Sequence, residues 1–417
     1  MALAQIEETD RTKAGGGTPG FALWALGFRP LYLVAGIYAA VSICAWVAQF
    51  AGWHDGGWPR DPLWHAHEMI FGFAFAVIVG FLFTAVQNWT ARPTPTGAPL
   101  AAIVALWVAA RVLLLAPWPL ASAVADGAFA IAAAWGVGLP LAQAGNRRNA
   151  FFVPLLLAFG AANIAFHLAM SGALDLSPRR MVQLGLDLIL FVIAVMGGRV
   201  IPMFTANARQ VRVRRLPWLE TVALGSILAL LAANLAVLPP AMIAGLALLA
   251  TLAHVARIAL WRPWATLGHP MLWILHASYL WIVVHLALRA LAAADMVSPG
   301  AETHALTVGA IGGLILGMMV RTARGHTGRP LAAGATEIAA FALVQIAALV
   351  RVFTPFAAPS LALESIVASG LLWTLAFGLF AVRFWPILTR ARADGRPGPA
   401  RRARATMIRF LHRRSCP

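Results

Sequence analysis

The chain has 417 residues, of which 61% are hydrophobic and only 11% charged, with a mean hydropathy of +0.78. A soluble domain usually carries about 25% charged residues, so this composition excludes a soluble enzyme and indicates a polytopic membrane protein. The formal net charge of +17 does not indicate nucleic-acid binding, because the arginines gather in alternate loops and in the C-terminal tail.

In chain order, residues 1–21 predict a polar N-terminal tail without a cleavable signal peptide, and residues 389–417 an arginine-rich tail. Between them, residues 22–388 predict one all-α membrane domain. Nine arginines follow residue 389, and the loops on the same side carry most of the others, so we expect both termini in the cytoplasm of a bacterial inner membrane. The twelve expected spans lie at about 22–50, 62–89, 98–116, 119–143, 150–171, 180–204, 216–237, 240–261, 269–293, 300–322, 333–356 and 361–388.

An internal repeat couples the second span with the tenth. Seven identities recur at one offset of 237 positions (299 − 62 = 237), and Asp61 and Ser298 precede the two prolines as N-caps. The pattern predicts that helices 1–4 repeat as helices 9–12, with the middle four as a more diverged third unit. The identities are Pro62, His67, Gly72, Gly80, Thr90, Arg92 and Pro93, matched by Pro299, His304, Gly309, Gly317, Thr327, Arg329 and Pro330.

Histidine is the expected ligand of any redox cofactor. Only Cys44 and Cys416 are present, without a C-x-x-C-H motif or a cysteine set for an iron–sulfur cluster, so a haem would be non-covalent. His67 and His304 start equivalent helices and predict a pair that holds one flat cofactor, a b-type haem, between them. The alternative is that both only cap helices at the membrane boundary.

Arginines 111 and 351 occupy similar positions near the ends of the third and eleventh spans. Because arginine pairs well with carboxylates, Arg111 and Arg351 are candidate partners of the two haem propionates. The alternative is that each side chain extends to the lipid headgroups.

Further histidines lie inside or beside the spans and predict a second haem or a copper site. Positions i and i+2 of a helix point about 200° apart, so His65 and His67 are expected to have separate roles. For His276 the alternative is an interhelical hydrogen bond, and for His65 and His67 an interfacial pair that caps the helix and meets water. Asp126 and Asp187 are candidates for a proton path or for pairing with an arginine. The candidate metal ligands are His65, His67, His167, His276, His285 and His304.

Several strings together resemble the NnrS family over residues 22–388. They are Gly27-Phe28-Arg29-Pro30, Trp64-His65-Ala66-His67-Glu68-Met69, Gly80-Phe81-Leu82-Phe83-Thr84-Ala85-Val86-Gln87-Asn88-Trp89-Thr90, Gly198-Arg199-Val200-Ile201-Pro202-Met203-Phe204, and His304 to Ala310 followed by Arg324 to Pro330. The resemblance implies a twelve-span bacterial inner-membrane protein with haem and copper, linked to denitrification and to tolerance of nitric oxide. More loosely, the chain is similar to haem–copper oxidases, although it lacks their adjacent histidines at copper.

The predicted function is protection against nitric oxide and nitrosative stress, by binding that gas or reducing it. Reduction would need an electron donor in the membrane or periplasm. A transporter without a redox cofactor is the alternative from another class, because repeats and intramembrane charge fit it too. A third interpretation is a structural or regulatory membrane protein whose histidines only form hydrogen bonds.

Overall fold

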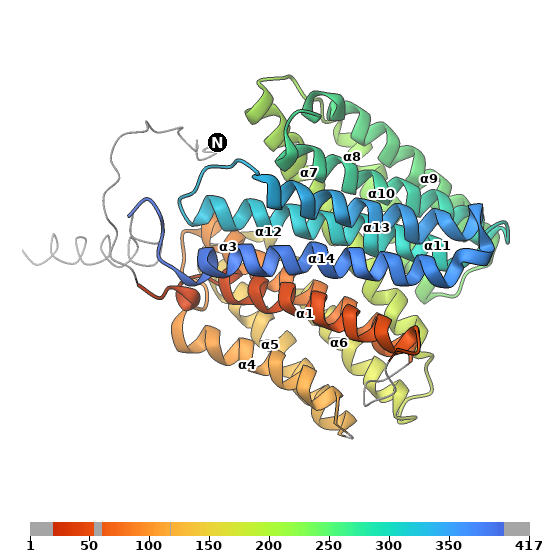
Figure 1. Cartoon of the computed structure of the whole chain (residues 1–417), viewed down its shortest axis with the longest axis horizontal. Coiled ribbons are helices and arrows are strands. Elements are labelled where there is room, and N and C mark those ends of the chain that lie inside the picture. Colours follow the sequence, from red (N-terminus) through yellow and green to blue (C-terminus); the bar gives the residue numbers. More distant parts are fainter. Residues whose placement is uncertain (1–19, 54–60, 117, 396–417) are drawn as a thin grey trace, which may run out of the picture.

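The computed structural model describes residues 20–53, 61–116 and 118–395 (Figure 1). Within these ranges every regular element is a helix, and the pair Phe21–Arg390 forms an isolated bridge. In the described part of the chain, twelve helices are long and apolar enough to cross a membrane, at the twelve predicted positions. The prediction of an all-α polytopic membrane protein is therefore confirmed. Most of the two predicted tails lies outside the described residues, and the likeness to haem–copper oxidases stays a prediction.

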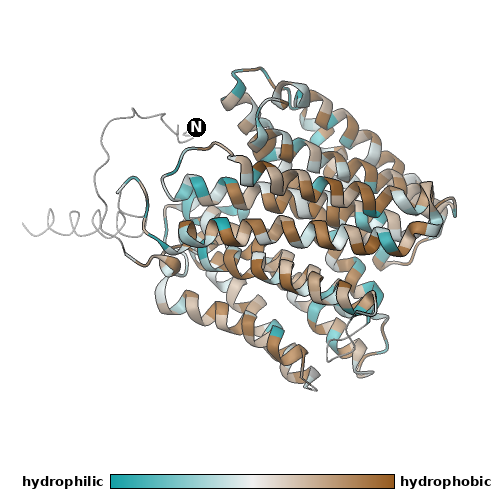
Figure 2. Cartoon of the chain, in the orientation of Figure 1, coloured by the Kyte–Doolittle hydropathy of each residue, from teal (hydrophilic) through white to brown (hydrophobic). Residues whose placement is uncertain are grey.

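The first six spans are built from α1 (Phe28–Phe50), α2 (Pro62–His67), η2 (Glu68–Ala74), α3 (Phe75–Thr90), α4 (Gly97–Leu114), α5 (Pro119–Gln143), α6 (Phe152–Met170) and α7 (Pro178–Arg209). The last six are built from α8 (Pro217–Leu235), α9 (Pro240–Leu260), α10 (Pro270–Ala293), α11 (Pro299–His304), η5 (Ala305–Gly312), α12 (Gly313–His326), α13 (Ala335–Ala357) and α14 (Ala362–Thr389). Figure 2 shows hydrophobic residues along the helices and hydrophilic ones mainly toward their ends.

The predicted repeat is visible in the backbone of the second and tenth spans. Each span consists of a six-residue α-helix, a π-helical segment and a longer α-helix, in the order α2–η2–α3 and α11–η5–α12. The first helix runs from Pro62 to His67 in one span and from Pro299 to His304 in the other, again 237 positions apart. π-helical segments are rare and occur frequently at functional sites.

The second, sixth and tenth spans form the centre of the bundle. Burial reaches 89% in the most apolar window of the second span and 72% in those of the other two, against 33% for α4. Helix α7 contacts α2, η2 and η5, so it completes the central trio. It too begins with serine and proline, Ser177 and Pro178, which is consistent with a third unit. Helices α1 and α14 lie side by side, so the first and last spans are in contact (Figure 1).

We call the end of the bundle where α2, α7 and α11 begin the histidine end. The opposite end, where α3, α7 and α12 finish, is the arginine end. Helix starts at the histidine end are fixed by the two predicted caps. The Asp61 carboxylate accepts a hydrogen bond from the Leu63 backbone N–H (2.8 Å), and Ser298 Oγ accepts one from Gly300 N–H (3.4 Å).

Candidate functional site

Helix α2 presents its two histidines to different surroundings. His65 stacks on the indole of Trp46 from α1, with ring centroids 4.3 Å apart. His67 is fully buried and stacks on Phe166 from α6, with centroids 4.7 Å apart. The two side chains therefore face different surroundings, because a spacing of two residues turns them about 200° apart; that they have separate roles stays a prediction.

A cavity of about 400 Å³ lies at the histidine end, between α1, α2, α7, α11, α13 and α14. Its wall is mostly apolar, and its ionisable side chains are His65, His304 and Arg351. A mostly apolar cavity of about 300–1,000 Å³ with a few convergent polar groups is the usual form of a cofactor site. We call it the two-histidine pocket.

His304 is oriented for ligation in this pocket. Its Nδ1–H donates to the Gly300 carbonyl at 2.7 Å, one turn back in the same helix. That bond leaves Nε2 with its lone pair, which is the form in which imidazole binds a metal. Among the described residues the His65 imidazole makes no hydrogen bond and the Arg351 guanidinium no ion pair, so both groups are available to a ligand.

The structure brings His65, and not His67, to the pocket of His304. The predicted haem pair of His67 and His304 is thus split between two locations, although the repeat places the two residues at equivalent positions. The predicted propionate partners are split as well. Arg351 lines the two-histidine pocket, whereas Arg111 is engaged in ion pairs elsewhere.

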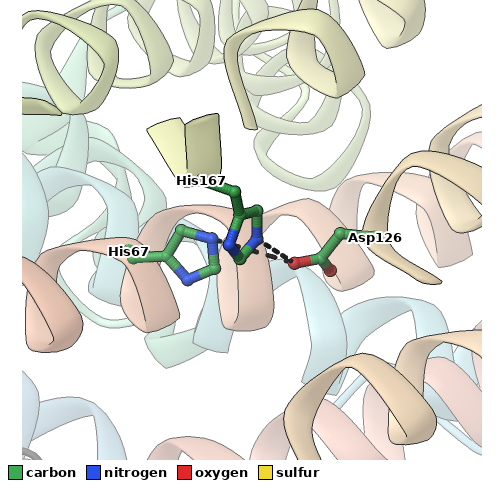
Figure 3. Close-up of side chains that lie close together, drawn as sticks. All are labelled: His67, Asp126 and His167. Carbon is green, nitrogen blue, oxygen red and sulfur yellow. Dashed lines mark hydrogen bonds and ion pairs between the residues drawn. The ribbon is translucent and has the colours of Figure 1, made fainter. Parts of the chain in front are cut away.

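His67 belongs to a buried cluster that also contains Asp126 of α5 and His167 of α6 (Figure 3). One ligand atom from each residue lies within 4.8 Å of the others, so this group could hold a metal ion. His167 Nε2 is 3.0 Å and His67 Nε2 is 3.8 Å from Asp126 Oδ2. All three side chains are at most 3% exposed. We call this group the His–Asp–His cluster.

A second set of polar groups supports the cluster. The Nδ1–H of His67 donates to Glu68 Oε1 at 2.7 Å, and its Nε2 lies 2.7 Å from Asn163 Oδ1. A histidine that binds a metal almost always donates its other ring N–H to a carboxylate, a carbonyl or water. The hydroxyl of Tyr38 donates to the other oxygen of Glu68. Glu68 thus orients His67 as the supporting carboxylate of a metal site would, whereas Asn163 lies against the Nε2 atom that a metal would bind.

Arg111 lies between the two carboxylates of this region. Its NH2 group donates a hydrogen bond to Asp126 Oδ1 at 2.5 Å. Its Nε lies 3.1 Å from Glu68 Oε2, and this second contact is an ion pair without an aligned hydrogen bond. One buried cation thus compensates two buried carboxylates. Isolated charges of this kind would be very costly in a membrane protein.

The remaining predicted metal ligands lie apart from both sites. His276 Nε2 is 2.8 Å from Thr205 Oγ1, so His276 has a hydrogen-bonding partner. The Nδ1–H of His285 donates to the Glu302 carbonyl at 2.9 Å. Beside it, Asp187 forms an ion pair with Arg289 at 2.8 Å and accepts a hydrogen bond from Asn234. For Asp187 the predicted alternative, pairing with an arginine, is what the structure shows.

Two residues that support the cluster, Asn163 and Tyr38, have no sequence motif that marks them. Asp126 is predicted from the sequence only for a proton path or for pairing with an arginine, and Arg289, the ion-pair partner of Asp187, is not predicted at all. The available signal was their position, since polar residues inside a span usually face the protein interior. It did not indicate which of them converge.

Comparison with known proteins agrees with the motifs. A search of curated proteins finds no match. The family model described as NnrS protein matches residues 22–392, which is most of the chain and includes every residue of the two-histidine pocket and the His–Asp–His cluster. The chain therefore belongs to the NnrS family.

Proposed function

We propose that the protein binds a b-type haem in the two-histidine pocket and protects a bacterial cell against nitric oxide. The observation that carries the proposal is the convergence of His65, His304 and Arg351 on one largely apolar cavity. His65 and His304 would be the axial ligands. Arg351, which lacks an ion-pair partner among the described residues, would face a propionate.

The second cofactor we propose is copper in the His–Asp–His cluster. Imidazole nitrogen and carboxylate oxygen are ligands that copper accepts, and Glu68 would fix the orientation of His67. Arg111 would offset the charge of Asp126 and Glu68 while the metal is absent.

Ferrous haem and cuprous copper each bind nitric oxide, so these centres would supply binding or reduction of the gas. The protein itself would contribute a dry pocket and fixed ligands, and its apolar helices would admit a gas that dissolves in the bilayer. Family membership supports a link to denitrification. We place the chain in the inner membrane with both termini in the cytoplasm, because the arginines gather at one end of the bundle.

The test is a reduced-minus-oxidised optical spectrum of the detergent-purified protein, with metal analysis of the same samples. We expect His65→Ala and His304→Ala to lose the b-type signal. His67→Ala should keep the signal and lose copper. A matched control is His269→Ala at the arginine end, where the exposed His269 Nε2 lies 2.8 Å from Arg209 NH1. This variant should keep both the haem signal and the copper.

Two results would contradict the proposal. Loss of the haem signal in His67→Ala with retention in His65→Ala would restore the pair predicted from the repeat. A colourless wild type after expression with adequate haem would overturn the cofactor assignment and leave a transporter as the better interpretation. Survival of cells carrying each variant under nitric oxide then tests the physiological role.

A further inference from the structure

A second cavity of about 90 Å³ lies nearer the arginine end, between the three central spans. Its wall consists of aliphatic, methionine and aromatic side chains with one glycine, and no charged residue lines it. We call it the apolar cavity. It is lined by Tyr32 of α1, Val77, Ile78, Phe81 and Leu82 of α3, six residues of α7 between Val192 and Ile201, Leu275 of α10, and Leu314, Ile315 and Met318 of α12.

The apolar cavity follows the two-histidine pocket along the same helices. The deepest residue of the pocket on the second span is Phe73, and Val77 of the cavity comes four residues later. On the tenth span, Ile311 of the pocket is followed by Leu314 of the cavity. At a rise of about 1.5 Å per residue, roughly one helical turn separates the two spaces.

The chemistry of the wall restricts the occupant. Cavities lined by leucine, isoleucine and phenylalanine stay dry and take up apolar molecules such as xenon, because water would find too few hydrogen-bonding partners there. The volume of about 90 Å³ is too small for a haem, and a wall without polar surface does not suit a lipid headgroup. What fits is an uncharged molecule of a few atoms, a class that includes nitric oxide and other diatomic gases.

We propose that the apolar cavity binds a small apolar gas molecule and holds it one helical turn from the two-histidine pocket. The binding itself depends only on the cavity. Supply of nitric oxide to the pocket rests on the proposed function. Phe73 of η2 and Ile311 of η5 lie at the pocket side of the intervening turn, so the two π-helical segments end where a molecule would pass between the spaces.

The experiment uses xenon as the probe, with the full-length protein crystallised and pressurised with the gas. Anomalous scattering should place a xenon atom among Ile78, Met196 and Leu314. Leu314→Phe should remove that atom by filling the space, and Val192→Leu, a milder change, should lower its occupancy. The matched control is Leu375→Phe on α14, whose side chain is 56% exposed and should leave xenon in place.

Absence of xenon from this cavity, at a pressure that fills other sites, would overturn the proposal. Equal occupancy in wild type and Leu314→Phe would do the same. Xenon binding needs no haem, so this result is independent of the spectra above. In haem-loaded protein, Leu314→Phe should change the kinetics of nitric oxide rebinding after flash photolysis; unchanged kinetics despite lost xenon would refute the supply role alone.

Discussion

Replacement of Arg111 by methionine tests whether the His–Asp–His cluster is held together by charge. Methionine keeps much of the side-chain volume and removes the only arginine that pairs with Glu68 and Asp126 among the described residues. Glu68 is fully buried and Asp126 is 2% exposed. Removing one partner of a buried ion pair typically costs about 3–5 kcal/mol, and here one deletion takes the arginine from two carboxylates, which keep only their contacts to His67, His167 and Tyr38. We therefore expect a loss of about 3–5 kcal/mol.

The measurement is unfolding of the metal-free protein in mixed micelles, at increasing fractions of denaturing detergent. The matched control is Arg215→Met. Arg215 is 45% exposed, lies 3.5 Å from Glu220, and leaves that carboxylate paired with Arg257 when it is removed. Exposed pairs contribute about 0–1 kcal/mol, so the control should unfold nearly as the wild type does.

A second variant isolates the electrostatic origin of the loss. Combining Arg111→Met with Glu68→Gln and Asp126→Asn removes both carboxylates that have lost their arginine and should recover a large part of the stability, because neutral amides are far less costly to bury. If Arg111→Met unfolds within about 1 kcal/mol of Arg215→Met, the argument that Arg111 compensates two buried charges is refuted.

Three further outcomes are expected. Glu68→Gln should weaken copper binding by about 10- to 100-fold, measured by competition with a chelator, because Glu68 orients His67; an unchanged affinity would remove Glu68 from the metal site. Arg351→Gln should make haem easier to extract by apomyoglobin, while Arg321→Gln, whose side chain stacks on Phe204 away from the pocket, should not. Gly309→Ala should destabilise the protein by about 1–3 kcal/mol, because a Cβ there would overlap Trp281, whereas Gly378→Ala on α14 meets no atom within 4 Å and should be neutral or stabilising.

The span number and the repeat could be predicted because they depend on local patterns. Apolar length identifies a span, and identities at a fixed offset identify equivalent helices. The offset also matches the starts of the π-helical segments, Glu68 and Ala305, while their ends differ by one position; no residue pattern predicted that these segments would be π-helical. Their i→i+5 bonding depends on packing around η2 and η5, which a sequence alone does not describe.

The pairing of the histidines could not be predicted from the repeat. When repeat units are arranged around a common centre, equivalent residues point in the same direction relative to their own unit. In the whole bundle they therefore point toward different neighbouring helices. His67 faces α5 and α6, whereas His304 faces the space beside α1 and α14. Only the spacing of His65 and His67 indicated that they would separate. Which of them meets His304 depends on the rotation of α2 about its axis.

Helix α2 contributes one histidine to each of the two candidate sites, two positions apart in the chain. Ala66 alone stands between His65, which faces the two-histidine pocket, and His67, which faces the His–Asp–His cluster. Any turn of α2 about its axis displaces the two imidazoles in opposite directions. The cap at Asp61 and the π-helical segment η2 limit that turn at either end. A rotation of α2 would therefore change the geometry of both sites together, whereas truncating one imidazole changes only its own site.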